Sequence, residues 1–268
     1  MNRRHALLLV AVVALVASAG CLGYIRGGGT IDNSTLDQDP KTDYVWDSDR
    51  DVYVDIGADA TYRAVYNVSG RDKLELYAES GYGTKEPLDL RAFRYQYANG
   101  TVINGSEFRA RGGEIERTTD RVWVRFGEDL DDGKVAFSGE GSPRRFILQT
   151  YVEGSYEVVL PAGYTTNFWL FGHISPRGYE VTTEDGRQHI VWEEVTSEAV
   201  LVQAYRERDF WIFVGIAIVA TGIAVGGLLY FRRQLTELRA RRQSLGLDVE
   251  EEYDEHEDDR DGPPPGRP

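Results

Sequence analysis

The sequence predicts an all-β fold, an antiparallel β-sandwich of the Ig-like type, followed by a single C-terminal transmembrane α-helix. Apolar and polar side chains alternate along several runs, which is typical of strands with one buried face. Turn-forming sequences separate these runs at regular spacing, and this spacing favours a sandwich over a barrel. Near the C-terminus, residues 210–231 form a charge-free stretch long enough to cross a bilayer.

Residues 1–20 resemble an export signal of the lipoprotein type. Arg3 and Arg4 precede an apolar run that ends in small residues, and Cys21 follows directly, where a lipoprotein signal is cleaved and the cysteine receives a lipid. Because Cys21 is the only cysteine, a disulfide framework and multi-cysteine metal sites are excluded. In an alternative interpretation, residues 6–25 stay uncleaved as a membrane helix. Both interpretations place the following chain outside the cell.

Two segments of different composition follow the signal. Residues 21–43 are rich in Gly, Asp and Thr and poor in large apolar side chains, which predicts a flexible spacer. Residues 44–208 carry the alternating pattern and form the predicted extracellular β region. Within it, the Gly-Glu-Gly-Ser-Pro sequence at residues 139–143 could divide two sheet bodies, and one elongated sandwich is the alternative.

The β region contains clear strand and turn signals. Residues 131–134 and 184–187 predict hairpin turns, as do the Asn-Gly dipeptides at residues 99 and 104. The uncharged run Phe168–Phe171 predicts a fully buried strand, with an exposed aromatic loop as the alternative. The apolar positions expected to be buried in the clearest strands are Tyr62, Ala64, Tyr66, Val68, Leu74, Leu76, Val122, Val124, Val200 and Val202.

The C-terminal part predicts a membrane anchor with a defined orientation. Trp211 and Tyr230 lie near the ends of the charge-free stretch, where amphipathic rings favour the headgroup zone. Arginines dominate the residues after this stretch, whereas those before it are interleaved with acids, so a cytoplasmic C-terminus is expected. Residues 232–247 are predicted to continue as a basic juxtamembrane helix, and residues 248–268 to form a disordered acidic tail.

Two kinds of candidate site accompany this topology. Four Asn-X-Ser/Thr sequons fall in the exported portion, and we expect about half of them to be glycosylated; they begin at Asn33, Asn67, Asn99 and Asn104. In the transmembrane stretch, Gly222 and Gly226 form a Gly-X-X-X-Gly motif, and Gly215 lies one heptad upstream on the same face. This small-residue face would allow a homodimer through the helix.

The charge balance limits the partners and indicates an environment. The 44 acidic residues exceed the 30 basic ones, which excludes a general nucleic-acid binder because such a protein needs a basic face. Only four of the basic residues are lysines, namely Lys41, Lys73, Lys85 and Lys134. Acid excess with few lysines is typical of proteins in brine, since carboxylates favour solubility and molar salt screens their mutual repulsion.

The chemistry-bearing residues do not form an enzymatic motif. Of the four histidines, only His173 and His189 fall in the β region, without the spacing of a metal-binding pair. The region has no cysteine nucleophile, Gly-X-Ser-X-Gly elbow or phosphate loop. We therefore expect no catalytic residues, no metal site and no cofactor.

Several sequence features together resemble a haloarchaeal membrane-protein family of unknown function. They are the Arg-Arg signal ending in Cys21, the segments Tyr66–Tyr77, Val152–Pro161 and Trp192–Ser197, the membrane stretch, Leu245–Asp248 and the Gly-Pro-Pro-Pro-Gly sequence near the end. The resemblance implies a salt-loving source and the topology above, and it implies no catalytic residues.

These observations predict a non-enzymatic, membrane-anchored surface protein that binds unknown envelope partners. A second hypothesis is an accessory or sensor subunit that signals through its cytoplasmic tail. A third, an envelope hydrolase, has the least support in the sequence.

Overall fold

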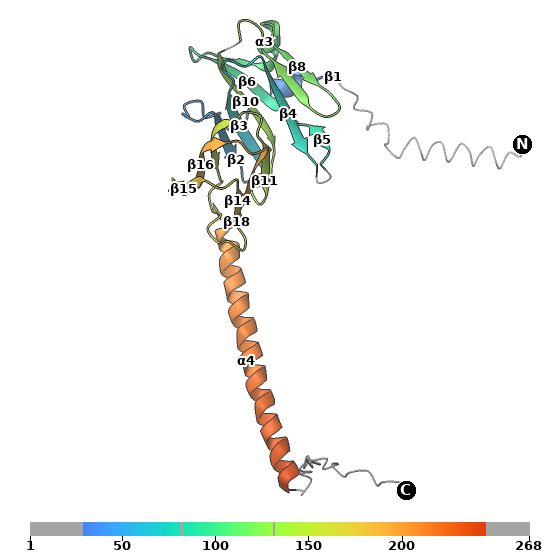
Figure 1. Cartoon of the computed structure of the whole chain (residues 1–268), viewed down its shortest axis with the longest axis vertical. Helices are drawn as coiled ribbons and strands as arrows, with labels where there is room; N and C mark the ends of the chain where they lie inside the picture. The colour runs from blue at the N-terminus through green and yellow to red at the C-terminus, as the bar shows by residue number, and fades with distance from the viewer. Residues whose placement is uncertain (1–28, 81–82, 131, 245–268) are drawn as a thin grey trace, which may run out of the picture. The chain divides into compact units, whose positions relative to one another are not determined.

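The computed structural model describes residues 29–80, 83–130 and 132–244 and has β-rich structure followed by one long C-terminal helix (Figure 1). The chain divides into two compact units, Met1–Phe210 and Trp211–Pro268. The predicted signal at residues 1–20, the lipid-attachment candidate Cys21 and the predicted tail at residues 248–268 lie outside the described residues.

The largest sheet has eight strands in the order β15-β16-β12-β2-β3-β10-β6-β7. Its strands in this order are Tyr179–Glu184, Arg187–Val195, Gly154–Val159, Val52–Ile56, Thr61–Asn67, Gly133–Glu140, Arg91–Tyr97 and Val102–Asn104. All neighbours pair antiparallel except β12 and β2, which are parallel. This parallel pair departs from the predicted sandwich, in which all strands were antiparallel. The Ig-like arrangement of the strands stays a prediction.

Three smaller sheets complete the β unit. A five-stranded sheet has the order β1-β8-β9-β4-β5, with strands Gly29–Thr30, Glu114–Arg117, Val122–Arg125, Lys73–Glu79 and Lys85–Pro87. A three-stranded sheet has the order β11-β17-β14, with strands Phe146–Gln149, Ala199–Gln203 and His173–Ser175. Finally, β13 (Tyr164–Thr165) pairs with β18 (Tyr205–Arg206). The helices are α2 (Asn33–Leu36), α3 (Gly105–Ala110) and α4 (Glu207–Ser244).

One hydrophobic core joins the eight-, five- and three-stranded sheets. Tyr66 and Phe137 of the large sheet, Leu76 and Val124 of the five-stranded sheet, and Val202 of the three-stranded sheet belong to the same buried cluster. The predicted apolar positions of residues 62–68, 74–76, 122–124 and 200–202 are all buried, so the alternating pattern is confirmed at these strands. A smaller cluster on the other face of the large sheet includes Tyr44 and Tyr53.

Two of the predicted hairpin turns are confirmed, and two are wrong. Asp185 and Gly186 connect β15 to β16 with positive φ angles of 50° and 73°, as a two-residue hairpin of antiparallel strands requires. Asn99-Gly100 lies between the paired strands β6 and β7. By contrast, Gly133 begins β10, and the preceding strand β9 belongs to a different sheet. Asn104 is the N-cap of α3, so this dipeptide begins a helix instead of a hairpin.

Part of the predicted flexible spacer is ordered. Within residues 29–43, β1 pairs with β8, and the Leu36 side chain is completely buried in the core. Arg94 donates to the Gln38 carbonyl at 3.0 Å, and Ser106 donates its backbone N–H to Asp37 at 2.9 Å. The spacer interpretation of residues 29–43 is therefore wrong: the apolar side chains of Ile31 and Leu36, together with polar contacts, attach this segment to the β unit.

Residues 139–143 lie inside this unit. Gly139 and Glu140 are the last residues of β10, and strands from both sides of this segment pair in the large sheet, where β12 lies next to β2. The first compact unit runs without a division from the N-terminal side of this segment to Phe210.

Candidate membrane interface

Helix α4 contains a segment that is long and apolar enough to cross a membrane. Its 38 residues include the charge-free stretch at residues 210–231. At a rise of 1.5 Å per residue this stretch is about 33 Å long, close to the roughly 30 Å thickness of a hydrocarbon layer. Its one residue with a polar aliphatic side chain, Thr221, donates to the Ala217 carbonyl at 2.8 Å, so its hydroxyl is satisfied within the helix.

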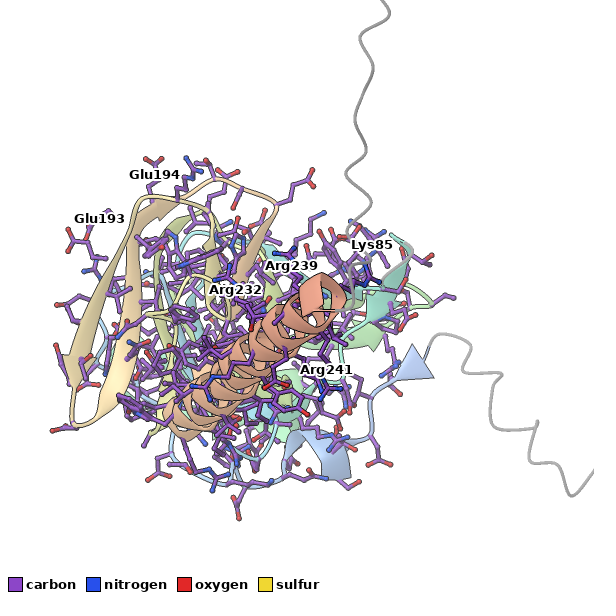
Figure 2. The ribbon with its side chains drawn as sticks, turned by 90° about the horizontal axis from the view of Figure 1, so that it is seen from below. Lys85, Glu193, Glu194, Arg232, Arg239 and Arg241 are labelled. Atoms are coloured by element: carbon purple, nitrogen blue, oxygen red, sulfur yellow. The ribbon has the colours of Figure 1, made fainter. Side chains whose placement is uncertain are left out.

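The C-terminal end of the stretch is followed by polar and basic side chains on the same helix. Gln234 donates to the Tyr230 hydroxyl at 3.1 Å, which gives the phenol a polar partner at the end of the apolar segment. Further along, Arg232, Arg239 and Arg241 project from the helix (Figure 2). Such a change from apolar to basic side chains is the pattern expected where a helix leaves a bilayer.

The candidate association glycines all lie on the exposed surface of α4. Apart from the helix's own backbone, no heavy atom of the described residues lies within 4 Å of where a Cβ would stand at Gly215, Gly222 or Gly226. This face is therefore open to the close approach of another helix.

The β unit ends at its connection to α4 in a short two-stranded sheet. Strand β18 pairs with β13, and the first helical residue, Glu207, donates its N–H to the Gly163 carbonyl at 3.1 Å. Arg206 donates from Nε to the Tyr164 hydroxyl at 2.9 Å, and this hydrogen bond raises the pKa of the guanidinium above its ordinary value. The first turn of α4 is thus hydrogen-bonded to the β unit.

Four aromatic side chains pack together at this connection, and we call Phe168, Phe171, Tyr205 and Phe210 the junction cluster. The Phe168 ring lies 5.1 Å from that of Phe210 and 5.5 Å from that of Phe171, measured between centroids. Tyr205 lies 5.6 Å from Phe171 and 6.3 Å from Phe210. Because Phe210 begins the charge-free stretch, the cluster joins the β unit to the start of the apolar segment.

The prediction that Phe168–Phe171 is a buried strand is wrong. These four residues form a turn in which Trp169 is 81% exposed and Leu170 51% exposed, while Phe168 and Phe171 are half-buried. The alternative, an exposed aromatic loop, is confirmed. The flanking turn-forming residues Asn167 and Gly172 were the sequence signal for a loop, but an apolar run gives no indication by itself of whether protein covers it.

The four sequons differ in exposure and in hydrogen bonding. Asn99 is exposed in the β6–β7 hairpin, and its side chain accepts only the Thr101 N–H, at 3.0 Å, among the described residues. Asn33 is exposed and accepts from Arg109, whereas Asn67 is half-buried and accepts from the Ser69 N–H at 3.1 Å. Asn104 is half-buried and accepts from the Glu107 N–H at 2.9 Å and the Ser106 hydroxyl at 3.0 Å.

The two histidines of the β unit are on separate strands. His189 on β16 lies 2.7 Å from Glu157 on β12, measured from Nδ1 to Oε1, whereas His173 is exposed on β14. Within the described ranges no three His, Cys, Asp or Glu side chains are arranged to hold a metal ion.

These features define a class of protein, a β-rich unit followed by one C-terminal helix that is long and apolar enough to cross a membrane. Residues 48–250 match the family of unknown function DUF5803, and the chain belongs to this family. No curated protein matches the sequence.

One solved structure has a weak likeness to the chain. It is a mutant M1 zinc metallopeptidase from Deinococcus radiodurans bound to a Tyr-Ser-Ala substrate, at 12% sequence identity and a TM-score of 0.31. The match covers 57% of this chain and 41% of the peptidase chain. A likeness of this size supports no inference about fold or activity.

Proposed function

We propose that the protein is a membrane-anchored cell-surface protein, and that its β region is a non-enzymatic binding or structural module of the cell envelope. In this proposal residues 44–208 are an extracellular, Ig-like sandwich and the C-terminus is cytoplasmic. The observation that carries it is the charge-free stretch of α4 followed by arginines. A lipid on Cys21 would add a second anchor, with glycans on some of the sequons.

The acidic composition supports a salt-loving, haloarchaeal setting for this surface protein. Asp55 is the single acid that is buried among the described residues, so the remaining acids there are at least partly exposed. Exposed carboxylates repel one another at low ionic strength, and molar salt shortens the screening length to about 3 Å. A surface of this kind is suited to brine.

The distribution of lysines allows a direct test of sidedness. All four lysines precede α4 and none follows it, while Lys85 projects from the surface of the β unit (Figure 2). The Lys41 side chain is 69% exposed. A membrane-impermeant amine reagent applied to intact cells should therefore label peptides containing Lys41 and Lys85.

An Arg260→Lys variant is the matched control, because it places one lysine in the acidic tail. That lysine should react only after the cells are permeabilised. Labelling of the tail lysine in intact cells, with Lys41 and Lys85 protected until permeabilisation, would overturn the proposed orientation.

The second candidate, an accessory or sensor subunit of a membrane complex, is favoured by the continuity of α4. The helix runs from β18 through the apolar stretch to Ser244 without interruption, so it could transmit a change between the two sides. Deleting residues 248–268 separates the two candidates: an external binding module should keep its function, whereas a signalling subunit should lose it. An envelope hydrolase is the least supported candidate, and a substrate panel on the purified chain is its test.

The exposed glycine face supports homodimer formation through α4. Gly222→Ile places a branched side chain on this face and should abolish a detergent-resistant dimer. Ile218→Leu changes an exposed side chain of the same stretch without altering its bulk and is the matched control. A dimer that survives Gly222→Ile would exclude this face as the contact.

A further inference from the structure

The loop Asn167–Gly172 of the β unit carries exposed apolar side chains and no charge. Residues 158–172 contain no Asp, Glu, Lys or Arg, in a sequence of which 28% is charged. The exposed turn of the β15–β16 hairpin has the opposite character, with Glu184 and Asp185 in it. Trp169 is 81% exposed and the adjoining Leu170 is 51% exposed, and adjoining exposed apolar side chains indicate an interaction surface.

The loop is held firmly at its base. The buried side chain of Gln188 accepts from the Thr166 N–H at 2.9 Å and donates to the Asn167 side chain at 2.9 Å. Within the loop, Gly172 donates its N–H to the Phe168 carbonyl at 2.7 Å. A Cβ at Gly172 would lie 2.1 Å from the Thr166 carbonyl oxygen, so the two ends of the loop approach as closely as a glycine permits.

The loop also lies beside the start of the apolar stretch of α4. Phe168 packs on Phe210 at 5.1 Å, and both residues belong to the same compact unit. Phe210 is the first residue of the charge-free stretch, at the depth where a membrane helix enters the headgroup layer. Trp169 directly follows Phe168, and tryptophan is the side chain that most favours this layer, because its ring is apolar and its N–H is polar.

We propose that the loop Asn167–Gly172 is a second membrane contact, which inserts Trp169 and Leu170 into the interfacial layer of the bilayer that α4 crosses. This inference rests on the proposed function, since it requires α4 to span a membrane. The occupant of the exposed surface is lipid, because the loop adjoins the membrane-entry residue Phe210 and has no charge to pair with a protein partner. The two contacts together would restrict how the β unit can tilt on the membrane.

Tryptophan quenching by lipid tests the proposal on the full chain. The protein is reconstituted into phosphatidylcholine–phosphatidylglycerol vesicles in which the lipid is brominated near the glycerol end of one acyl chain. The Trp211→Phe variant removes the tryptophan of α4, so the lipid-quenched signal that remains comes from the β unit. We expect this signal to be quenched, and we expect most of the quenching to disappear in Trp169→Phe/Trp211→Phe. Trp123→Phe/Trp211→Phe is the matched control, since Trp123 is half-buried on β9, and its quenching should equal that of Trp211→Phe.

The single variant Trp169→Phe separates the loop from the anchor. In this variant Trp211 should still be quenched, which reports α4 in the bilayer. If Trp211 is quenched while Trp169 makes no difference, the loop proposal is overturned and the proposed function stands. If Trp211 is not quenched either, the anchor itself fails and the loop proposal fails with it. Protection of Trp169 from aqueous acrylamide in native membranes, without quenching by brominated lipid, would assign the surface to a protein partner and also overturn the proposal.

Discussion

Two aromatic clusters in the same compact unit pack alike but are covered to very different extents. In the core cluster, formed by Tyr62, Tyr66, Phe137 and Phe146, neighbouring rings lie 5.1–6.4 Å apart and no residue is more than 3% exposed. In the junction cluster the rings lie 5.1–6.3 Å apart, yet all four residues are half-buried and the adjoining Trp169 is 81% exposed. The difference shows that similar ring packing does not imply similar burial. In our proposal, lipid surrounds Trp169 beside the junction cluster.

The burial of the core cluster follows from the register of the paired strands β3 and β10. Ala64 on β3 lies opposite Phe137 on β10, and Tyr62 lies opposite Gly139. A Cβ at Gly139 would lie 2.7 Å from the Tyr62 ring, so the absence of a side chain there makes room for the aromatic ring. Burial of this kind also disfavours the charged form of a phenol and raises the pKa of Tyr66 well above its ordinary value. The four residues of the junction cluster, by contrast, stay half-buried.

The largest expected effect comes from removing a ring from the core cluster. Phe137→Ala should lower the free energy of unfolding by about 3–5 kcal/mol, because a large cavity forms among residues that cannot collapse onto it. Trp169→Ala should change it by less than about 0.5 kcal/mol in detergent, since this side chain is mostly exposed. Urea unfolding of the full chain in detergent, followed by near-UV circular dichroism, measures both. Equal losses for the two variants would remove the distinction between the clusters.

The same contrast should hold for ion pairs. Asp55, with its side chain 10% exposed, pairs with Arg63 at 2.6 Å and also with Arg187. By contrast, Arg144 and Asp209 near the junction are 3.8 Å apart, with side chains 70% and 43% exposed. Asp55→Ala should cost about 3 kcal/mol, because the guanidinium groups of Arg63 and Arg187, whose side chains are 15% and 31% exposed, lose their carboxylate. Arg144→Ala should cost less than about 0.5 kcal/mol. The same urea titration measures the unfolding free energy of both variants. A large loss of unfolding free energy in Arg144→Ala would contradict the contrast and show that the junction depends on the Arg144–Asp209 pair.

Raising the pH should destabilise the fold where burial disfavours the ionised form of a tyrosine. Burial, followed by the nearby carboxylates of Asp55 and Glu157, raises the pKa of Tyr53 from its ordinary 10.0 to about 12. The folded protein therefore holds this proton more tightly than the unfolded chain, so the stabilisation is complete below pH 10.0 and is lost as the pH rises through about 12. The loss is at most about 2.7 kcal/mol for a shift of two units. Tyr53→Phe should flatten the fall of unfolding stability above pH 10.0, and an unchanged slope would contradict this assignment.

Local periodicity in the sequence predicted the buried strand faces. It did not predict features that depend on contacts between distant segments of the chain. The alternation at Val122 and Val124 identified a buried strand face because one sheet face always needs apolar cover. The run Phe168–Phe171 has the same composition as a buried strand, yet it forms a turn beside Phe210 in which Trp169 is 81% exposed. The parallel pairing of β2 with β12 joins segments about a hundred residues apart, and no local pattern specifies it.

At the candidate glycosylation sites, the local turn sequence also did not determine the structure. The Asn-Gly dipeptides at residues 99 and 104 are identical in sequence, yet the first lies in a hairpin and the second begins α3. An asparagine side chain can accept a backbone N–H in either setting, so the dipeptide alone does not distinguish them. The helix forms at Asn104 because Phe108, four residues later, reaches the core, where it is completely buried.

Substitution of Asn99 or Asn104 should have the smallest effect on the unfolding free energy. These residues extend the comparison to the region around α3, which lies far from β14 and β18 within the β unit (Figure 1). Asn104→Ala should cost about 1 kcal/mol of unfolding free energy because it removes the N-cap of α3, whereas Asn99→Ala should cost less. Glycan occupancy should follow the opposite order, since the Asn99 side chain is exposed and that of Asn104 is half-buried in two hydrogen bonds. Intact mass of the protein from native membranes should therefore fall by one glycan in Asn99→Ala and remain unchanged, apart from the substitution, in Asn104→Ala. A glycan lost only from Asn104→Ala would mean that the cap opens before the sequon is modified, and that exposure in the folded state does not select the site.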